Sequence, residues 1–162
     1  MRTRRGIGGA AAAGLVIATL LLGSGPARAA NAGVPFRAAF EGQIAFTSET
    51  TVAWSGTGLG MQLGAATGGG NIVLTGGDES CPGGVANVHT ATLTAADGDT
   101  LTLTGHDVGC PISAYEFQGS GHWTVTGGTG RFAGVTGSGS VSAHANFATG
   151  AFTISWTGSL AL

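Results

Sequence analysis

Apolar residues alternate with threonine and serine in several short runs of the chain, and glycine separates these runs. Such alternation places one set of side chains on each face of an extended strand, so it predicts half-buried antiparallel strands. The last run alternates without a fault, because Phe152, Ile154 and Trp156 are each followed by threonine or serine. The pattern predicts eight strands, at residues 37–46, 50–56, 71–76, 89–95, 99–105, 115–127, 139–147 and 151–162.

Residues 89–105 are predicted to form a β-hairpin whose register follows from the side chains. Leu93 must face the same side as Leu101, which pairs residues whose numbers sum to 194. This register leaves residues 96–98 as a three-residue loop, with Gly98 at the position that needs a positive φ. The side-chain pattern and the turn chemistry therefore agree.

The fold class follows from the number and spacing of these strands. Eight strands, no convincing helix after the N-terminal segment and short turns favour an antiparallel meander. Closure of the meander removes exposed strand edges, so we predict an all-β, closed eight-stranded antiparallel barrel, with a β-sandwich as the alternative. The abundance of Gly, Thr and Ser alone would suggest a disordered linker, but the regular alternation argues against disorder.

The N-terminus has the pattern of an export signal. Three arginines precede an apolar run at residues 10–22, and Ala27 and Ala29 are spaced as an A-x-A cleavage site. The apolar run is shorter than the roughly 20 residues that a membrane span needs. We therefore expect a signal peptide at residues 1–29, cleaved after Ala29, and one domain at residues 30–162. An uncleaved anchor is the alternative, and "TRRGI" also permits twin-arginine export.

Removal of the signal changes the charge of the chain. Of the six basic residues only Arg37 and Arg131 remain, and all eight acidic residues follow residue 40, which gives a formal charge of −6. A protein that binds nucleic acid needs a basic surface that neutralises phosphates. The composition therefore argues against nucleic acid and anionic membranes as partners. The remaining chain of about 130 residues can bury a single core.

The stretch "GGTGRFAGVTGSGS", residues 127–140, contains six glycines in fourteen residues and lies between two predicted strands. A phosphate-binding glycine loop leads from a strand into a helix N-terminus, and no helix is predicted here. The stretch is therefore interpreted as a corner, where glycine permits a sharp bend and an aromatic side chain packs beneath the turn. The residues assigned to this turn are Gly127, Gly128, Gly130 and Phe132.

These turn residues also carry a resemblance. "GGTGRF" within "HWTVTGGTGRFAGVTGSGSVSAHANF" resembles the strand-turn-strand segment of the allene oxide cyclase and dirigent β-barrel superfamily, where GGTG-x-F recurs. "GTGLGMQLG", and the order "DGDTLTLTG" then "TVTGGTGRFAG", are similar to small secreted bacterial proteins of this type. The resemblance covers most of the mature chain.

The resemblance implies a dirigent-like or calycin-like barrel that holds a hydrophobic substrate. Some members cyclise an unstable epoxide, and others direct radical coupling. The polar active-site residues of the family cannot be matched to positions of this sequence, so catalytic residues stay unassigned. The superfamily often dimerises or trimerises, which leaves a homo-oligomer open.

Cys81 and Cys110 are the only cysteines, and each precedes a proline. An even number of cysteines in an exported protein indicates a disulfide. The hairpin register supports this pairing, because it places residue 84 opposite Cys110, at the open end of the hairpin. The bond would stabilise the fold by roughly 3 kcal/mol. Free thiols or metal ligands are the alternative, but two cysteines without CxxC spacing make a poor metal site.

Ionisable side chains inside the barrel are candidates for ligand binding, because such groups can have a shifted pKa and act as a general acid or base. His89 shares a face with Ala91 and Leu93, so it is expected to point inward. Tyr115 and Glu41 are the other two candidates. The alternative for His89 is a structural histidine, satisfied by a hydrogen bond near the barrel mouth.

His122 and His144 fall on the Thr/Ser face of their strands, which is expected to face solvent. The sequence contains no Ser-His-Asp spacing, HExxH motif or EF-hand loop, and "DGDT" is shorter than a calcium loop. We therefore expect no metal and no cofactor.

Three classes of function are compatible with these features. The first is a secreted barrel that binds a small hydrophobic molecule in its lumen. The second is a cyclase-like or dirigent-like enzyme, and the third is a cell-surface interaction or structural protein that uses the Thr-rich exterior. The sequence favours the first and leaves enzymatic activity open. A lumen large enough for a ligand would favour the binding protein or the enzyme over the surface protein. Turnover of the bound molecule would favour the enzyme over the binding protein.

Overall fold

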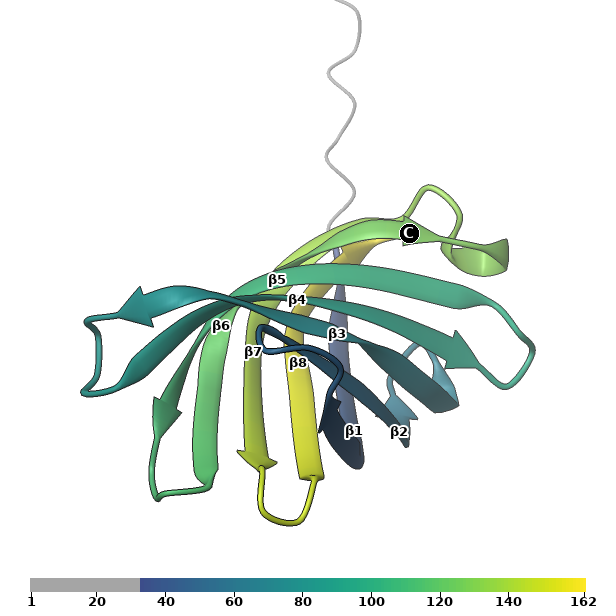
Figure 1. Cartoon of the computed structure of the whole chain (residues 1–162). Coiled ribbons are helices and arrows are strands. Elements are labelled where there is room, and N and C mark those ends of the chain that lie inside the picture. Colours follow the sequence, from purple (N-terminus) through teal and green to yellow (C-terminus); the bar gives the residue numbers. More distant parts are fainter. Residues whose placement is uncertain (1–32) are drawn as a thin grey trace, which may run out of the picture. The chain divides into compact units, whose positions relative to one another are not determined.

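The computed structural model describes residues 33–162, which form a closed barrel of eight antiparallel strands. Each strand pairs with the next one along the chain, and the last pairs with the first (Figure 1). The predicted fold class is therefore confirmed. The strands are β1 (Val34–Phe46), β2 (Thr51–Gly60), β3 (Gly64–Asp78), β4 (Gly84–Ala95), β5 (Thr100–Pro111), β6 (Glu116–Gly128), β7 (Thr136–Asn146) and β8 (Ala151–Ala161).

The alternation predicted for the last strand is present in β8. Phe152, Ile154 and Trp156 are buried in the lumen, whereas Thr153 and Thr157 are exposed. Closure of the sheet makes this possible, because every strand of a barrel has one inner and one outer face. The core of the protein is therefore the lumen itself.

The hairpin of β4 and β5 has the predicted register. Leu93 pairs with Leu101, and the pairing continues toward the far end of both strands, where Val85 lies opposite Gly109. The connecting turn is closed by a bond from the N–H of Gly98 to the carbonyl of Ala95, and Gly98 has a φ of 90°. Both predictions about this hairpin are confirmed.

The disulfide between Cys81 and Cys110 is also confirmed. The two Cα atoms are 6.0 Å apart, which is a normal separation for a disulfide. Cys81 lies in the turn between β3 and β4, and Cys110 lies near the end of β5. The bond therefore ties this turn to the hairpin that follows it.

The glycine-rich residues 56–70 differ from the sequence prediction, since they extend β2 and β3 instead of preceding a short strand. Glycine is unfavourable in a strand, but here it makes room for aromatic rings. A Cβ atom at Gly58 would lie 2.0 Å from the backbone oxygen of Ala39 and 2.7 Å from the ring of Phe40, and one at Gly68 would lie 2.9 Å from the ring of Trp54. Packing inside the barrel therefore overrides local propensity.

The glycine-rich turn after β6 contains the short 3-10 helix η1 (Gly130–Phe132). Phe132 is buried beneath the turn, and the guanidinium of Arg131 lies over its ring. Arg131 also pairs with Asp97 in the turn between β4 and β5. These contacts join two neighbouring turns at one end of the barrel, which we call the glycine-turn end.

The half of the lumen next to the glycine-turn end is filled. The rings of Phe36 and Trp123 meet edge to face with centroids 5.4 Å apart, and Leu101 and Leu160 are fully buried near them. The indole N–H of Trp123 donates to the carbonyl of Ser140 at 3.0 Å, so its polar atom is satisfied. Aromatic packing therefore closes this half of the barrel.

Candidate functional site

The other half of the lumen contains a cavity of about 320 Å³. We call this the lumen cavity, and the barrel end beside it the cavity end. The turns at the cavity end comprise residues 47–50, 79–83, 112–115 and 147–150. Most of the lining is apolar, and includes Val52, Ile72, Leu74, Phe117, Phe147 and Phe152.

His89 is the buried polar residue of this cavity. It lies on β4, and its side chain is 1% exposed. Gly105, its neighbour on β5, makes room for the ring, because a Cβ atom there would lie 2.0 Å from Cε1 of His89. The indole N–H of Trp156 donates to Nε2 of His89 at 3.4 Å. The expectation that His89 points inward agrees with this placement.

Asp107 is the partner of His89. Its Oδ2 atom lies 2.5 Å from Nδ1 of His89, and its side chain is 11% exposed. Because an indole N–H can only donate, Nε2 of His89 must be an acceptor, which leaves the ring proton on Nδ1. His89 therefore donates from Nδ1 to the carboxylate of Asp107.

The two carboxylate oxygens of Asp107 differ in their hydrogen bonding, because only Oδ2 has a partner within residues 33–162. Oδ1 is buried and has no hydrogen-bond partner among the described residues. Gly121, opposite Asp107 on β6, makes room for it, because a Cβ atom there would lie 2.3 Å from Oδ1. Asn87 lies opposite Asp107 on β4 and lines the same cavity. The lumen cavity thus combines apolar walls with one group of polar side chains.

The negative charge in the lumen cavity comes from Asp107, and no arginine or lysine of the described chain lines the cavity. Within residues 33–162 the chain has two arginines and no lysine. Arg37 is exposed on β1, and Arg131 lies at the glycine-turn end. The electrostatic potential inside the cavity is therefore set by a carboxylate that is hydrogen-bonded to a histidine.

The three candidate residues lie in different places. His89 is deep in the lumen cavity, and Tyr115 lies in the turn between β5 and β6, where it lines the cavity with 61% of its surface exposed. Glu41 is exposed on the outer face of β1 and does not contribute to the lumen cavity. The structure therefore brings His89 and Tyr115 to one site and leaves Glu41 outside it.

Asp107 and Asn87 were missed by the sequence analysis, although a signal for them exists. Alternation along β5 places Leu103, Gly105 and Asp107 on one face, and the register that sums to 194 puts Asn87 opposite Asp107. Glycine at residue 105 interrupts the apolar alternation, so the pattern of apolar residues alone does not extend the inner face to Asp107. Extending the hairpin by one residue pair on the inner face would have found both side chains.

The other histidines lie on the outer face of the barrel. His106 and His122 are exposed and directly opposite each other on β5 and β6, and His144 is half-buried on β7. Across residues 33–162, no three His, Cys, Asp or Glu side chains come together in an arrangement that could hold a metal ion. The outer histidines are thus separate from the lumen cavity.

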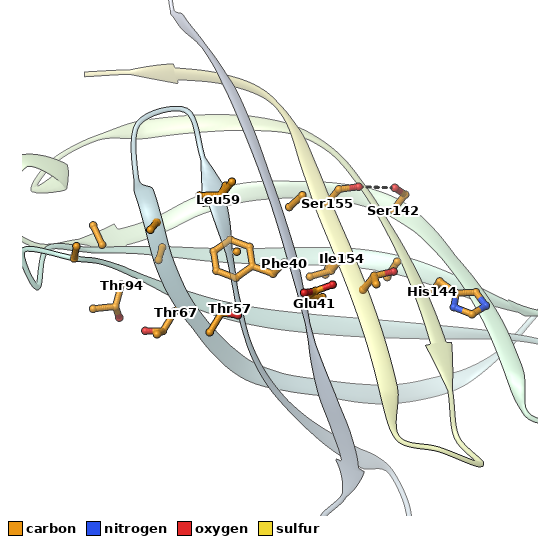
Figure 2. A pocket seen from close by; sticks show the side chains of 18 of the residues that line it. Phe40, Glu41, Thr57, Leu59, Thr67, Thr94, Ser142, His144, Ile154 and Ser155 are labelled. Atoms are coloured by element: carbon orange, nitrogen blue, oxygen red, sulfur yellow. Dashed lines mark hydrogen bonds between the residues drawn. The ribbon is translucent and has the colours of Figure 1, made fainter.

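A larger hollow of about 1200 Å³ lies mainly against β1, β2, β3, β7 and β8, with further lining residues from β4 and β6, and we call it the outer hollow (Figure 2). Glu41, Thr57 and Leu59 line it with exposed side chains, and His144 lies at its β7 side. The hydroxyls of Ser142 and Ser155 bond to each other across two of these strands at 3.0 Å. The outer hollow is thus a surface of mainly small and hydroxylated side chains.

The comparisons with known proteins give no family assignment. No protein-family model matches the chain, and no curated protein matches it. In the described part of the chain, no helix has the length and hydropathy needed to cross a membrane. The fold and the chemistry of the lumen cavity are therefore the basis for a functional proposal.

Proposed function

We propose that this protein is a secreted β-barrel that binds a small hydrophobic molecule in the lumen cavity. The observation that supports this most strongly is an apolar cavity of about 320 Å³ with one buried group of polar side chains. Pockets that bind small molecules have this composition, in which apolar walls supply affinity and a few polar groups fix orientation. His89 and Asp107 would be the orienting groups.

The lumen cavity is a better candidate than the outer hollow, although the outer hollow is larger. A ligand in the lumen would be surrounded by Phe117, Phe147 and Phe152 and would lose most of its contact with water. A ligand in the outer hollow would rest mainly on exposed threonine, serine and alanine side chains, and Leu59 is the large apolar side chain exposed there. The hydrophobic effect therefore favours the lumen.

Secretion is part of the proposal and has two supports. The first is the signal-like pattern at residues 1–29, whose cleavage after Ala29 lies outside the described residues. The second is the disulfide between Cys81 and Cys110, which is consistent with an oxidising compartment.

Binding of N-phenyl-1-naphthylamine, whose fluorescence rises in apolar surroundings, tests the proposed function. Ala145 faces the lumen between Phe117 and Phe152, so Ala145→Leu narrows the lumen cavity. We expect saturable binding to the native protein and roughly tenfold weaker binding to Ala145→Leu, because overpacking costs affinity. Ala45→Leu, the same substitution on the outer face of β1, is the matched control and should bind normally. Equal binding to all three proteins would place the probe outside the lumen.

An enzyme is the second candidate, favoured by the hydrogen bond between His89 and Asp107 inside an apolar cavity. This would be a cyclase-like or dirigent-like activity, as the sequence resemblance implies. Mass analysis of the bound molecule before and after incubation distinguishes the two. A ligand recovered unchanged supports a binding protein, whereas conversion by the native protein but not by Asp107→Asn supports an enzyme.

A further inference from the structure

We infer that the lumen cavity selects an uncharged ligand with a hydrogen-bond donor, such as an apolar alcohol, whose donor bonds to Oδ1 of Asp107. This inference rests on the proposed function, because it specifies the ligand of the same cavity. It goes beyond that function by naming the atom that receives the ligand and the chemical class that the cavity rejects.

The first argument is the unpaired oxygen. Nearly all buried polar atoms in folded proteins have a hydrogen-bond partner, and an exception requires an explanation. Oδ1 of Asp107 is such an exception among the described residues. Because Asp107 lines the lumen cavity, a molecule held there can supply the missing donor.

The second argument is that the neighbouring side chains do not supply this donor. The Nδ1 proton of His89 is already used by Oδ2 of Asp107. Asn87 lies opposite Asp107 in the register but makes no bond to Oδ1. Gly121, which faces Oδ1 from the other side, has no side chain to contribute. The fold of the described residues thus leaves this buried acceptor without a donor, on a residue that lines the cavity.

The third argument is charge, and it excludes anionic ligands. A carboxylate ligand would place its charge beside that of Asp107 inside apolar walls, where like charges repel strongly. No arginine or lysine lines the cavity to compensate. Fatty acids and other anionic amphiphiles are therefore the class that the cavity rejects, although its walls are apolar enough for their chains.

Three probes with the same ring system test this inference by isothermal titration calorimetry at pH 7. 2-Naphthylmethanol has a donor, its methyl ether lacks the donor, and 2-naphthoate carries a negative charge. We expect the alcohol to bind roughly tenfold more tightly than the ether, since hydrogen bonds to charged groups are among the stronger ones. We expect no measurable binding of 2-naphthoate.

Two variants locate the effect. In Asp107→Asn the amide oxygen accepts from Nδ1 of His89, and the NH2 group, which can only donate, takes the place of the free oxygen. The ratio of the alcohol affinity to the ether affinity should therefore fall from roughly ten to near one. Glu41→Gln removes a carboxylate from the outer face of β1 and is the matched control, in which the ratio should stay unchanged.

The outcomes separate the inference from the proposed function. Equal binding of the alcohol and the ether to the native protein, or binding of 2-naphthoate as tight as that of the alcohol, overturns the inference and leaves the proposed function standing. An alcohol preference that persists in Asp107→Asn assigns the donor to another group and also overturns it. Binding of none of the probes overturns the proposed function itself. The comparison of probes on the native protein needs no variant, so it holds even if Asp107→Asn does not fold.

Discussion

Nδ1 of His89 lies 2.5 Å from Oδ2 of Asp107, on the neighbouring strand, inside a lumen that is otherwise largely apolar. Two glycines allow this arrangement, because Gly105 leaves space for the imidazole ring and Gly121 leaves space for the carboxylate. Trp156 holds the ring from its other side through a bond to Nε2. The two glycines and the indole of Trp156 together therefore fix the position of the polar pair.

The first prediction concerns Gly105. In Gly105→Ala the added Cβ atom would lie 2.0 Å from Cε1 of His89 and 2.7 Å from the backbone oxygen of His122, so the backbone cannot easily relax. We expect a loss of about 1 to 3 kcal/mol in the free energy of unfolding, measured by urea denaturation.

Gly109→Ala is the control for this substitution. Gly109 is on the same strand and lines the same cavity, but an added Cβ atom there has only ordinary contacts, the nearest at 3.8 Å. Its stability should be close to that of the native protein. A similar loss of unfolding free energy in both variants would show that alanine is unfavourable anywhere on this part of β5, and would contradict a specific role of Gly105 in leaving space for His89.

The second prediction concerns the buried pair. Replacing His89 with leucine leaves the Asp107 carboxylate buried without its donor, which should lower the free energy of unfolding by roughly 3 kcal/mol. Replacing both residues with leucine removes the unpaired charge as well, so the double variant should be more stable than His89→Leu alone. Urea denaturation of the four proteins of this cycle gives the coupling energy. Additive effects would contradict a direct bond between the two side chains.

The fold was largely predictable because its signals are local. The register of β4 and β5 follows from Leu93, Leu101 and the loop with Gly98, all within a few residues of each other. The disulfide followed from that register together with the position of Cys81. Alternation and turn chemistry are sufficient for features of this kind.

The rest was not predictable because it depends on strands that are distant along the chain. The extension of β3 through Gly68 is explained by rings that come from β1 and β2, and alternation alone does not show which rings meet which glycines. The unpaired oxygen of Asp107 likewise depends on Gly121 of β6. The outward direction of Glu41, in contrast, follows from a local signal, since Glu41 alternates with the buried Phe40 along β1.

The third prediction concerns the disulfide. Cys81 and Cys110 are separated by 29 residues, and closing a loop of this length stabilises a fold by about 3 kcal/mol in the chain-entropy model. The double variant Cys81→Ser/Cys110→Ser should be less stable by that amount in urea denaturation. A reducing agent should lower the stability of the native protein and have no effect on the double variant. An unchanged native protein after complete reduction would contradict this account.

The fourth prediction concerns acid stability at the glycine-turn end. The backbone N–H of Asp99 donates to Asp97, and together with Arg131 it holds the pKa of the Asp97 carboxyl below its ordinary value of 3.8. A carboxyl whose pKa is lower in the folded chain stabilises the fold above the unfolded-state pKa, and this contribution disappears as the pH falls through the folded-state pKa. The native protein should therefore have a higher Tm than Asp97→Asn at neutral pH, and the difference should shrink and disappear as the pH falls below 3.8, the ordinary pKa of the carboxyl.

Glu49→Gln is the control for the loss of a negative charge, because Glu49 is exposed in the turn after β1 at the cavity end. Its Tm should follow that of the native protein more closely than the Tm of Asp97→Asn does. A constant difference between the native protein and Asp97→Asn from neutral to acidic pH would contradict the proposed role of the Asp97 carboxylate.

The central claim, that the lumen cavity holds a small hydrophobic molecule, is tested most directly by native mass spectrometry. The protein is purified from the organism that makes it and measured as isolated, and again after organic extraction and addition of 2-naphthylmethanol. We predict a reproducible adduct of one small molecule per chain, which is removed by extraction, replaced by the added alcohol and weakened in Ala145→Leu. A bare protein mass in both measurements would contradict the claim.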